Sequence, residues 1–285
     1  MRRPITWLDV FTSTPLTGNG LAVVHDADGI DDATMLAFAR ETRLSETTFV
    51  QTPTRPGADY VNRIFTMTGE IPFAGHPSLG TAVAVARARG ADRVTYLQRT
   101  HAGDQPVEVR LDGDGARASM LQEPPSFGTE PSPAAVTAAA GLDERDAHPD
   151  LPAQVVSTGI AHLMAPLRDR EALERAAPPG PEALRALLEP LDALVLYLVA
   201  VDPDAGTAHA RGFFLAMGAL VEDPATGSAA GPLLAYLNDR AGTHSLTIRQ
   251  GDEIGRPSRI DCSWAEDRPR VAGDVVIVAD GHVSL

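Results

Sequence analysis

Two short stretches decide the expected fold: GHPSLGTA at residues 75–82 and ATGSAAGP at residues 225–232. Each stretch is rich in glycine and small residues, and each follows a short segment that holds acidic residues. Each also opens an alanine- and leucine-rich segment that ends at a glycine, which is typical of a helix. Because the stretches lie about 150 residues apart, one in each half of the chain, they predict two similar domains, each with a central helix.

The start of such a helix has a definite chemistry. Its first-turn N–H groups have no partner within the helix, and the helix dipole is positive there. Small residues also let the oxygens of a ligand approach the backbone. Two helix starts that face one cleft would therefore bind a small carboxylic acid. The alternative is two ordinary glycine-containing helix ends without a ligand, and the spacing alone leaves both interpretations open.

Hydrophobic patterning outlines further elements on both sides of these stretches. The predicted helices are 33–42, 77–89 ended by Gly90, 133–140, 182–188 and 227–240 ended by Gly242. The predicted strands are 5–11, 21–25, 47–51, 62–66, 107–111, 117–121, 154–158, 163–167, 194–201 and 208–214. The tail is expected to form strand 275–278, a turn at 280–281 and strand 283–285. A proline-rich polar segment, 123–133, is the predicted linker, which places one domain at 1–123 and another at 130–273.

The composition excludes several classes of protein. The formal net charge of −14 argues against nucleic acid and against an anionic membrane surface as partners, because both attract basic proteins. All 24 basic residues are arginine, so the chain has neither a Schiff-base lysine for pyridoxal phosphate nor a P-loop lysine. No run approaches the ~18 apolar residues of a membrane-spanning helix, and the first ten residues lead straight into a strand pattern. We therefore expect a cytoplasmic protein.

The potential metal ligands do not form a predicted site. The single cysteine, Cys262, allows no cysteine zinc cluster within one chain, and the histidines form no pair at ligand spacing. The sequence DGDG at residues 112–115 predicts a hairpin turn. A calcium loop is the alternative, but it needs a glycine at its sixth position, where Arg117 stands. We expect no metal and no cofactor.

Two side chains are candidates for acid/base chemistry. Glu46 lies between the predicted helix 33–42 and the strand 47–51 among apolar residues, where loss of hydration would raise its pKa towards neutrality. Such a group can both take and give a proton. His76 stands at a helix start, where the dipole favours the neutral imidazole. The alternatives are a solvated turn glutamate and a structural histidine.

Taken together, these segments resemble the PhzF-like (phenazine biosynthesis isomerase) family. Five matching pieces span nearly the whole chain in the family's order: LDVFT at 8–12 with Gly18 and Asn19, ARETRLSETTF at 39–49, RIFT at 63–66, EIPFAGHP at 70–77 and EDPATGSAAGP at 222–232. Any one piece is a weak signal, but five in order are specific. Gly20 and Met67 stand where the family usually has proline, and both positions lie outside the chemistry.

The resemblance implies an α+β fold like that of diaminopimelate epimerase. Each of two similar domains would be a curved, mostly antiparallel sheet or barrel around a central helix, with the active site between the domains and the strands of 274–285 returning to the first. It also implies a homodimer and a cofactor-free reaction on a small carboxylic acid. Glu46 matches the family's acid/base glutamate, and His76 and Asp223 match its assisting pair. The residues expected to hold the substrate are Asn19, Ser45, Gly75, Thr226, Gly227 and Ser228.

Three functions compete at this point. The leading hypothesis is an isomerase that shifts a proton on a small conjugated amino or hydroxy acid. The second is an epimerase or dehydratase-like enzyme for another small acid, and the third is a non-catalytic binding protein. Racemases of this fold use two cysteine thiols, one at the start of each central helix. Gly75 or a neighbour and Thr226 stand at those places, so the resemblance excludes that mechanism.

Overall fold

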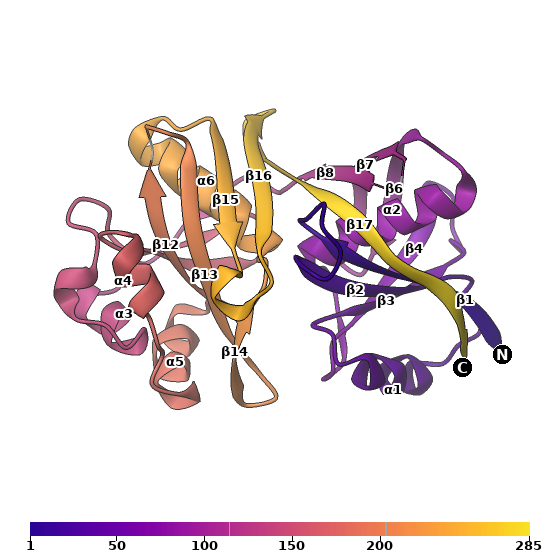
Figure 1. Cartoon of the computed structure of the whole chain (residues 1–285), viewed down its shortest axis with the longest axis horizontal. Helices are drawn as coiled ribbons and strands as arrows, with labels where there is room; N and C mark the ends of the chain where they lie inside the picture. The colour runs from indigo at the N-terminus through magenta and orange to yellow at the C-terminus, as the bar shows by residue number, and fades with distance from the viewer. Residues whose placement is uncertain (114, 203) are drawn as a thin grey trace. The chain divides into compact units, whose positions relative to one another are not determined.

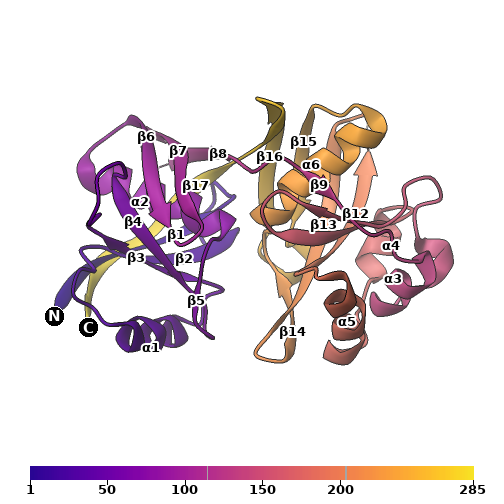
Figure 2. The ribbon, with the colours of Figure 1, turned by 180° about the vertical axis from the view of Figure 1, so that it is seen from behind.

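The computed structural model describes residues 1–113, 115–202 and 204–285. The chain forms two compact units (Figure 1). Unit 1 contains Met1–Met120 together with Ala272–Leu285, and unit 2 contains Leu121–Val271. Both units are α+β, with curved and mostly antiparallel strands around a central helix (Figures 1 and 2).

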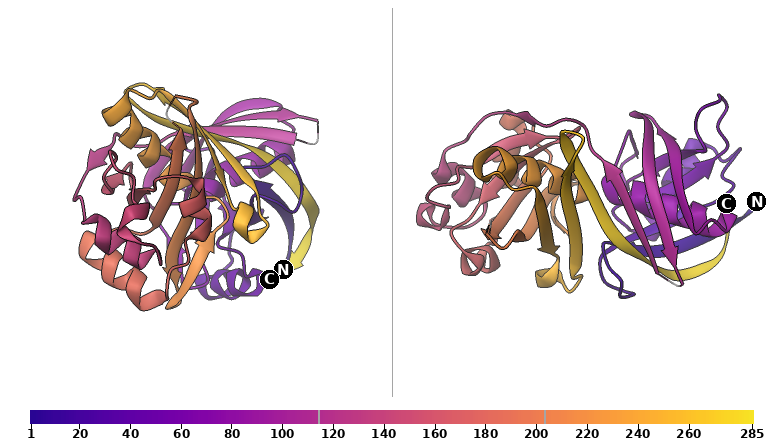
Figure 3. Two further views of the ribbon diagram at one scale, coloured as in Figure 1. Left: turned by 60° about the vertical axis from the view of Figure 1, so that its left-hand side comes forward. Right: turned by 90° about the horizontal axis from the view of Figure 1, so that it is seen from above.

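Unit 1 holds most of the predicted N-terminal elements. Its strands are β1 (Arg2–Val10), β2 (Asn19–Val24), β3 (Thr47–Gln51), β4 (Tyr60–Phe65), β5 (Glu70–Ile71), β6 (Arg93–Thr100), β7 (Gly103–Asp112) and β8 (Gly115–Leu121). Its helices are α1 (Asp32–Thr42) and α2 (Gly75–Arg89). The long strand β17 (Arg268–Ser284) pairs antiparallel with β1 (Figure 3).

Unit 2 has the larger set of helices. Its strands are β9 (Ser126–Phe127), β10 (Gln154–Ser157), β11 (Ala161–Pro166), β12 (Leu196–Asp202), β13 (Thr207–Ala216), β14 (Ala219–Asp223), β15 (Ser245–Gln250) and β16 (Ser258–Ala265). Its helices are α3 (Pro133–Ala139), α4 (Arg170–Arg175), α5 (Pro181–Leu188) and α6 (Gly227–Ala241). Short 3-10 turns lie at Glu144–Asp146, Glu189–Leu191 and Asp252–Ile254.

The two units repeat one order of strand pairing. In unit 1, β1 pairs antiparallel with β2, β2 parallel with β3, β3 and β4 antiparallel, β4 antiparallel with β5, and β4 parallel with β6, which pairs antiparallel with β7. In unit 2, β10 to β16 follow the same sequence of antiparallel and parallel pairs. The helix α2 follows β5, and the helix α6 follows β14. The similarity between the sequence stretches 75–82 and 225–232 therefore reflects a repeat of topology.

Both repeat helices are buried on all sides. The first twelve residues of α2 are buried, and α2 packs against β1, β2, β3, β4, β6 and β7. Most of α6 is buried as well, and it packs against β10, β11, β15 and β16. This explains why neither helix has a polar stripe. Each helix ends at a left-handed glycine, Gly90 or Gly242, whose N–H donates to last-turn carbonyls, as predicted.

Most predicted elements are confirmed, but the tail is not. All five predicted helices are present, whereas the elements β5, β6, β9, β14, β15, β16 and α4 were not predicted. Residues 280–281 form no turn, because β17 continues through them: Asp280 pairs with Thr6, and the Thr6 hydroxyl donates to the Asp280 carboxylate over 3.0 Å. Pairing with β1 overrides the local turn signal. The turn predicted at 112–115 includes residue 114, which lies outside the described residues; the flanking strands β7 and β8 pair antiparallel.

Candidate active site

Glu46 lies where the sequence predicts, between α1 and β3. Helix α1 ends at Arg43, which adopts a left-handed backbone with φ of 55°, and the chain then turns into β3. The first three residues of β3 are buried, which fixes the chain directly after Glu46. The side chain of Glu46 is only 17% exposed.

His76 is the second residue of α2, and its ring faces Glu46. The distance between His76 Nε2 and Glu46 Oε2 is 3.5 Å, and the ring also contacts the backbone of Gly20 in β2. Burial lowers the pKa of His76 to about 3, against the opposing effect of the Gly20 contact. The imidazole is therefore neutral at physiological pH, as predicted, although burial is the main cause.

The remaining predicted site residues of unit 1 lie beside Glu46, His76 or Gly20 in the sequence. Asn19 begins β2, is buried, and immediately precedes the residue that the His76 ring contacts. Ser45 is partly buried beside Glu46 in the sequence, and Gly75 is the buried first residue of α2. Unit 1 thus brings Glu46 and His76 close together, with Ser45 and Gly75 next to them along the backbone and Asn19 next to Gly20, which the His76 ring contacts.

Unit 2 places Asp223 in a network of hydrogen bonds. The Thr226 hydroxyl donates to Asp223 Oδ2 over 2.7 Å. The side-chain amide of Gln250 donates to the Asp223 carbonyl over 2.8 Å and to Thr226 Oγ1 over 2.9 Å. Its oxygen accepts from the Thr226 N–H and from the hydroxyl of Tyr197. Asp223 and Thr226 are therefore held together directly before Gly227 and Ser228, which start α6.

Two members of this network were not predicted. Gln250 ends β15 and Tyr197 lies in β12, and both are buried. Nothing near them in the sequence marks them as functional, because β13 pairs with β14, β12 and β15 only in the folded state. A glycine is also required opposite them: a Cβ at Gly212 would come within 2.6 Å of Thr226 Oγ1.

Each unit has an arginine–glutamate pair just before its central helix. In unit 1, Arg63 donates to both carboxylate oxygens of Glu70. In unit 2, Arg211 makes the same paired bonds to Glu222 over 2.9 and 2.8 Å, and it also donates to backbone carbonyls of α4 and the residue after it. Both glutamates stand five residues before the glycine that begins the helix. The acidic residues that precede the two similar sequence stretches thus include one pair, Glu70 and Glu222, at equivalent positions in the structure.

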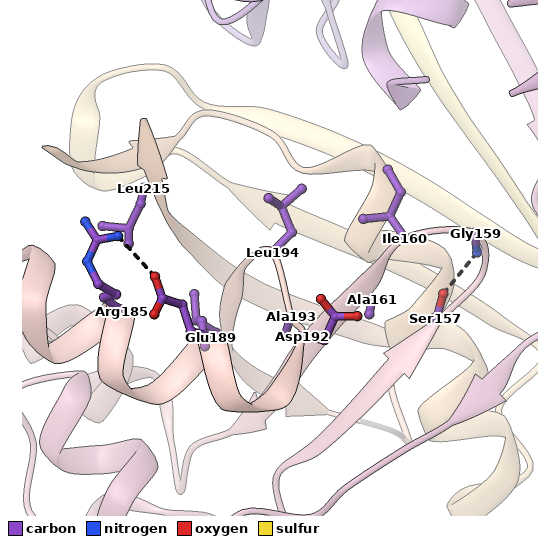
Figure 4. Close-up of a pocket in the computed structure, with 11 residues that line it drawn as sticks. Ser157, Gly159, Ile160, Ala161, Arg185, Glu189, Asp192, Ala193, Leu194 and Leu215 are labelled. Carbon is purple, nitrogen blue, oxygen red and sulfur yellow. Dashed lines mark hydrogen bonds and ion pairs between the residues drawn. The ribbon is translucent and has the colours of Figure 1, made fainter. Parts of the chain in front are cut away.

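A groove of about 730 Å³ lies elsewhere in unit 2 (Figure 4). It is lined by Ser157, Gly159, Ile160, Ala161, Arg185, Leu188, Glu189, Asp192, Ala193, Leu194 and Leu215. In Figure 4 the Arg185 and Glu189 side chains pair with each other. None of the predicted site residues lines this groove, so it does not mark the candidate site.

Two other features bear on the sequence predictions. The thiol of Cys262 is buried, and burial raises its pKa, so it is not a poised nucleophile. Within the described ranges, no helix is both long and apolar enough to cross a bilayer.

Comparison with known proteins identifies the family. The model of the phenazine biosynthesis-like protein family (PhzC-PhzF) matches residues 8–281. A trans-2,3-dihydro-3-hydroxyanthranilate isomerase of Pseudomonas aeruginosa is 39% identical over 260 residues, which cover 89% of this chain and 87% of the relative. An "uncharacterized isomerase" of Escherichia coli is 34% identical, with 92% and 90% covered. The solved structure of a predicted epimerase from P. aeruginosa is 37% identical and superposes with a TM-score of 0.86 over 99% of each chain. The chain therefore belongs to the phenazine biosynthesis-like family, and it is an isomerase.

Proposed function

We propose that this isomerase moves a proton on a small conjugated amino or hydroxy carboxylic acid, with Glu46 as the proton carrier and without a cofactor. The observation that carries the proposal is the close, largely buried approach of Glu46 Oε2 to the neutral ring of His76. A carboxyl group in such surroundings is suited to take a proton and to return it.

The neutral state of His76 matters for this role. A histidine cation would hold Glu46 in its charged form, whereas a neutral imidazole leaves both protonation states of the carboxyl accessible. The 3.5 Å separation is also longer than a regular hydrogen bond, so the Glu46 side chain is not locked onto the ring. His76 can then accept from the protonated carboxyl between the two transfer steps.

The reaction has two balanced steps. The Glu46 carboxylate removes a proton from a saturated carbon of the substrate, and the electron pair of the broken C–H bond moves into the conjugated system. The resulting carboxylic acid then donates a proton to the carbon at the far end of that system, which forms the new C–H bond and regenerates the carboxylate. No oxidant and no net proton is required.

The start of α6 is proposed to hold the substrate carboxylate. Its first N–H groups, including those of Gly227 and Ser228, supply donors and positive potential without a lysine. The Ser228 hydroxyl adds a donor, and Asp223, held in place by Thr226, can accept from an amine or hydroxyl of the same ligand. The expectation that Gly75 and the start of α2 serve the same ligand stays a prediction.

The relatives support a cyclic amino acid as the substrate. Because a relative named trans-2,3-dihydro-3-hydroxyanthranilate isomerase is 39% identical over most of both chains, we propose that compound or a close analogue as the first substrate to test. Incubation in D₂O followed by ¹H NMR separates the three hypotheses. A shifted double bond supports the isomerase, exchange at one carbon with inversion indicates an epimerase, and unchanged substrate indicates a binding protein.

The assembly is proposed to be a homodimer, on the strength of the family resemblance. Size-exclusion chromatography with light scattering is expected to give twice the mass of one chain. A monomeric mass would contradict this part of the proposal without affecting the assignment of Glu46. We also propose that neither nucleic acid nor a membrane is a partner, in line with the net charge of −14.

A further inference from the structure

Pro232 interrupts the hydrogen bonding of α6 close to its start. In an α-helix each N–H donates to the carbonyl four residues earlier, and proline has no N–H to donate. Pro232 lies inside α6, four residues after Ser228. The Ser228 carbonyl therefore lacks its donor within the helix, in the turn that is proposed to hold the substrate.

The ring of His162 lies against this carbonyl. His162 belongs to β11 and is completely buried, and its ring contacts the Ser228 backbone. Burial lowers the pKa of His162 to about 3, whereas the Ser228 contact acts in the opposite direction, as contact with an acceptor does. Neither ring nitrogen makes a regular hydrogen bond to any residue in the described part of the chain. The neutral ring thus brings an N–H to the place that Pro232 leaves without a donor.

Gln122 acts on the neighbouring carbonyl. Its side-chain amide donates to the Gly227 carbonyl over 3.0 Å, and its oxygen accepts from the Thr158 hydroxyl over 2.6 Å. The side chain of Gln122 lies directly on the helix backbone: a Cβ at Gly231 would come within 1.8 Å of its oxygen. Residue 231 must therefore be glycine for Gln122 to reach the start of α6.

The Gln122 bond fixes a peptide group that carries a proposed ligand donor, and the His162 contact fixes the peptide group that follows it, between Ser228 and Ala229. The Gly227 carbonyl and the Ser228 N–H belong to one peptide group. A hydrogen bond at the carbonyl orients that group and also polarises its N–H, which makes the N–H a stronger donor. We propose, resting on the function assigned above, that Gln122 and His162 are positioning residues that fix the first turn of α6 for the substrate carboxylate.

The start of α2 lacks this arrangement. The residue equivalent to Pro232 by position in the helix is Gly80, which has an N–H for the carbonyl of His76. The helix proline with a side chain placed at the carbonyl it leaves without a donor is therefore found in α6, which is proposed to bind the carboxylate, and not in α2.

Kinetics of three variants, two single and one double, test the proposal. Gln122→Leu removes one hydrogen bond to the Gly227 carbonyl, and His162→Leu removes the ring that lies against the Ser228 carbonyl. Each variant is expected to raise KM about three- to tenfold, with kcat changed less than twofold. Pro232→Ala restores an N–H opposite Ser228, so the double variant His162→Leu/Pro232→Ala is expected to recover KM to within about twofold of the wild type. An unchanged KM in both single variants, or no recovery in the double variant, would overturn the proposal.

A buried glutamine of unit 1 provides the matched control. Gln98 is completely buried and bonds to Asn62 and Gln105, which also belong to unit 1. Gln98→Leu is expected to lower stability as Gln122→Leu does, with KM unchanged. An equal rise of KM in both variants would show that loss of stability alone explains the effect. If Gln122→Leu does not fold, Gln122→Met keeps the length of the side chain and removes the same donor.

An amide NMR measurement tests the positioning role of Gln122 without any substrate. Loss of the Gln122 bond is expected to move the Ser228 amide proton to higher field, while Gln98→Leu leaves it in place. Titration with 2-aminobenzoate as the probe should then show about three- to tenfold weaker binding to Gln122→Leu. An unmoved Ser228 amide would refute the positioning role, whereas a moved amide in a protein inactive on the proposed substrate would refute only the proposed function.

Discussion

Units 1 and 2 share one strand order but carry different chemistry at the start of the central helix. In unit 1 the second helix residue is His76, and its buried ring reaches out to Gly20 in β2 and to Glu46. In unit 2 the equivalent helix residue is Ser228, and the histidine lies instead on the strand, as His162 in β11, with its ring against the Ser228 backbone. In both units a histidine ring contacts a backbone group across the helix and the strand. In unit 1 the helix supplies the ring, and in unit 2 the strand supplies it.

On the function proposed above, this difference separates two tasks. In unit 1 the histidine on the helix leaves a ring nitrogen beside a carboxyl group, which suits proton transfer. In unit 2 the histidine lies on the strand, and the helix start carries the small hydroxyl residue Ser228. The proposed division places catalysis in one copy of the repeat and carboxylate binding in the other, with one residue type moved across the same contact.

The largest expected effect is in unit 1. Glu46→Gln keeps the shape of the side chain but removes its ability to carry a proton, and kcat should fall about 10²–10⁴-fold. Glu41→Gln, at an exposed position of α1, is the control and should retain wild-type kcat. Steady-state rates with the proposed substrate make the comparison, and a fall in kcat shared by both variants would contradict the assignment.

The two arginine–glutamate pairs should contribute different amounts to the free energy of unfolding. Arg211→Met removes the donor that binds the Glu222 carboxylate and two backbone carbonyls in a buried setting, which should cost about 3 kcal/mol of unfolding free energy. Arg63→Met leaves a more exposed Glu70 and should cost about 1–2 kcal/mol. Urea unfolding of both variants provides the test. Equal losses would mean that the backbone contacts of Arg211 add nothing.

The two buried histidines predict acid sensitivity in both units. His76 and His162 stay neutral in the folded protein down to a pKa of about 3, but they take up protons near pH 6.5 once unfolded. Protonation therefore favours the unfolded state, and stability should fall from about pH 6.5 towards pH 3, by up to about 1.4 kcal/mol per pH unit for each histidine. Urea unfolding of wild type and His162→Leu at pH 4 to 7 checks the slope, which should be shallower in the variant. An identical slope would place the protonation elsewhere.

The smallest expected effect concerns the network around Asp223. Thr226→Val removes the hydroxyl that donates to Asp223 Oδ2, and kcat/KM should fall about tenfold, as expected for a hydrogen bond to a charged group. Thr137→Val removes a buried hydroxyl bond within α3 of the same unit and should leave kcat/KM unchanged. If both variants lose the same activity, the network has no special role.

Local signals in the sequence predicted much of this comparison. The residues that start and end a helix are close to it in the sequence, so the glycine after each central helix and the junction at Glu46 were located correctly. The strands β6, β15 and β16 were missed; β6 and β15 each pair with the following strand but also with a distant one, β4 or β13, which local patterns do not reveal. Gln122, His162 and Gln250 were missed because each acts on α6 or on Asp223 from another strand or from the residue after β8. Pro232 inside a helix is a local signal that could have pointed to a donor such as His162.

The most direct test of the central claim is a single-turnover measurement of C–H cleavage by Glu46→Gln. The substrate is deuterated at the carbon that loses its hydrogen, mixed with excess enzyme, and followed by mass spectrometry. We expect the wild type to release or transfer the deuterium with a primary isotope effect, and Glu46→Gln to bind the substrate but cleave the bond at least 100-fold more slowly. Cleavage at the wild-type rate by Glu46→Gln would contradict the account, because another group would then carry the proton.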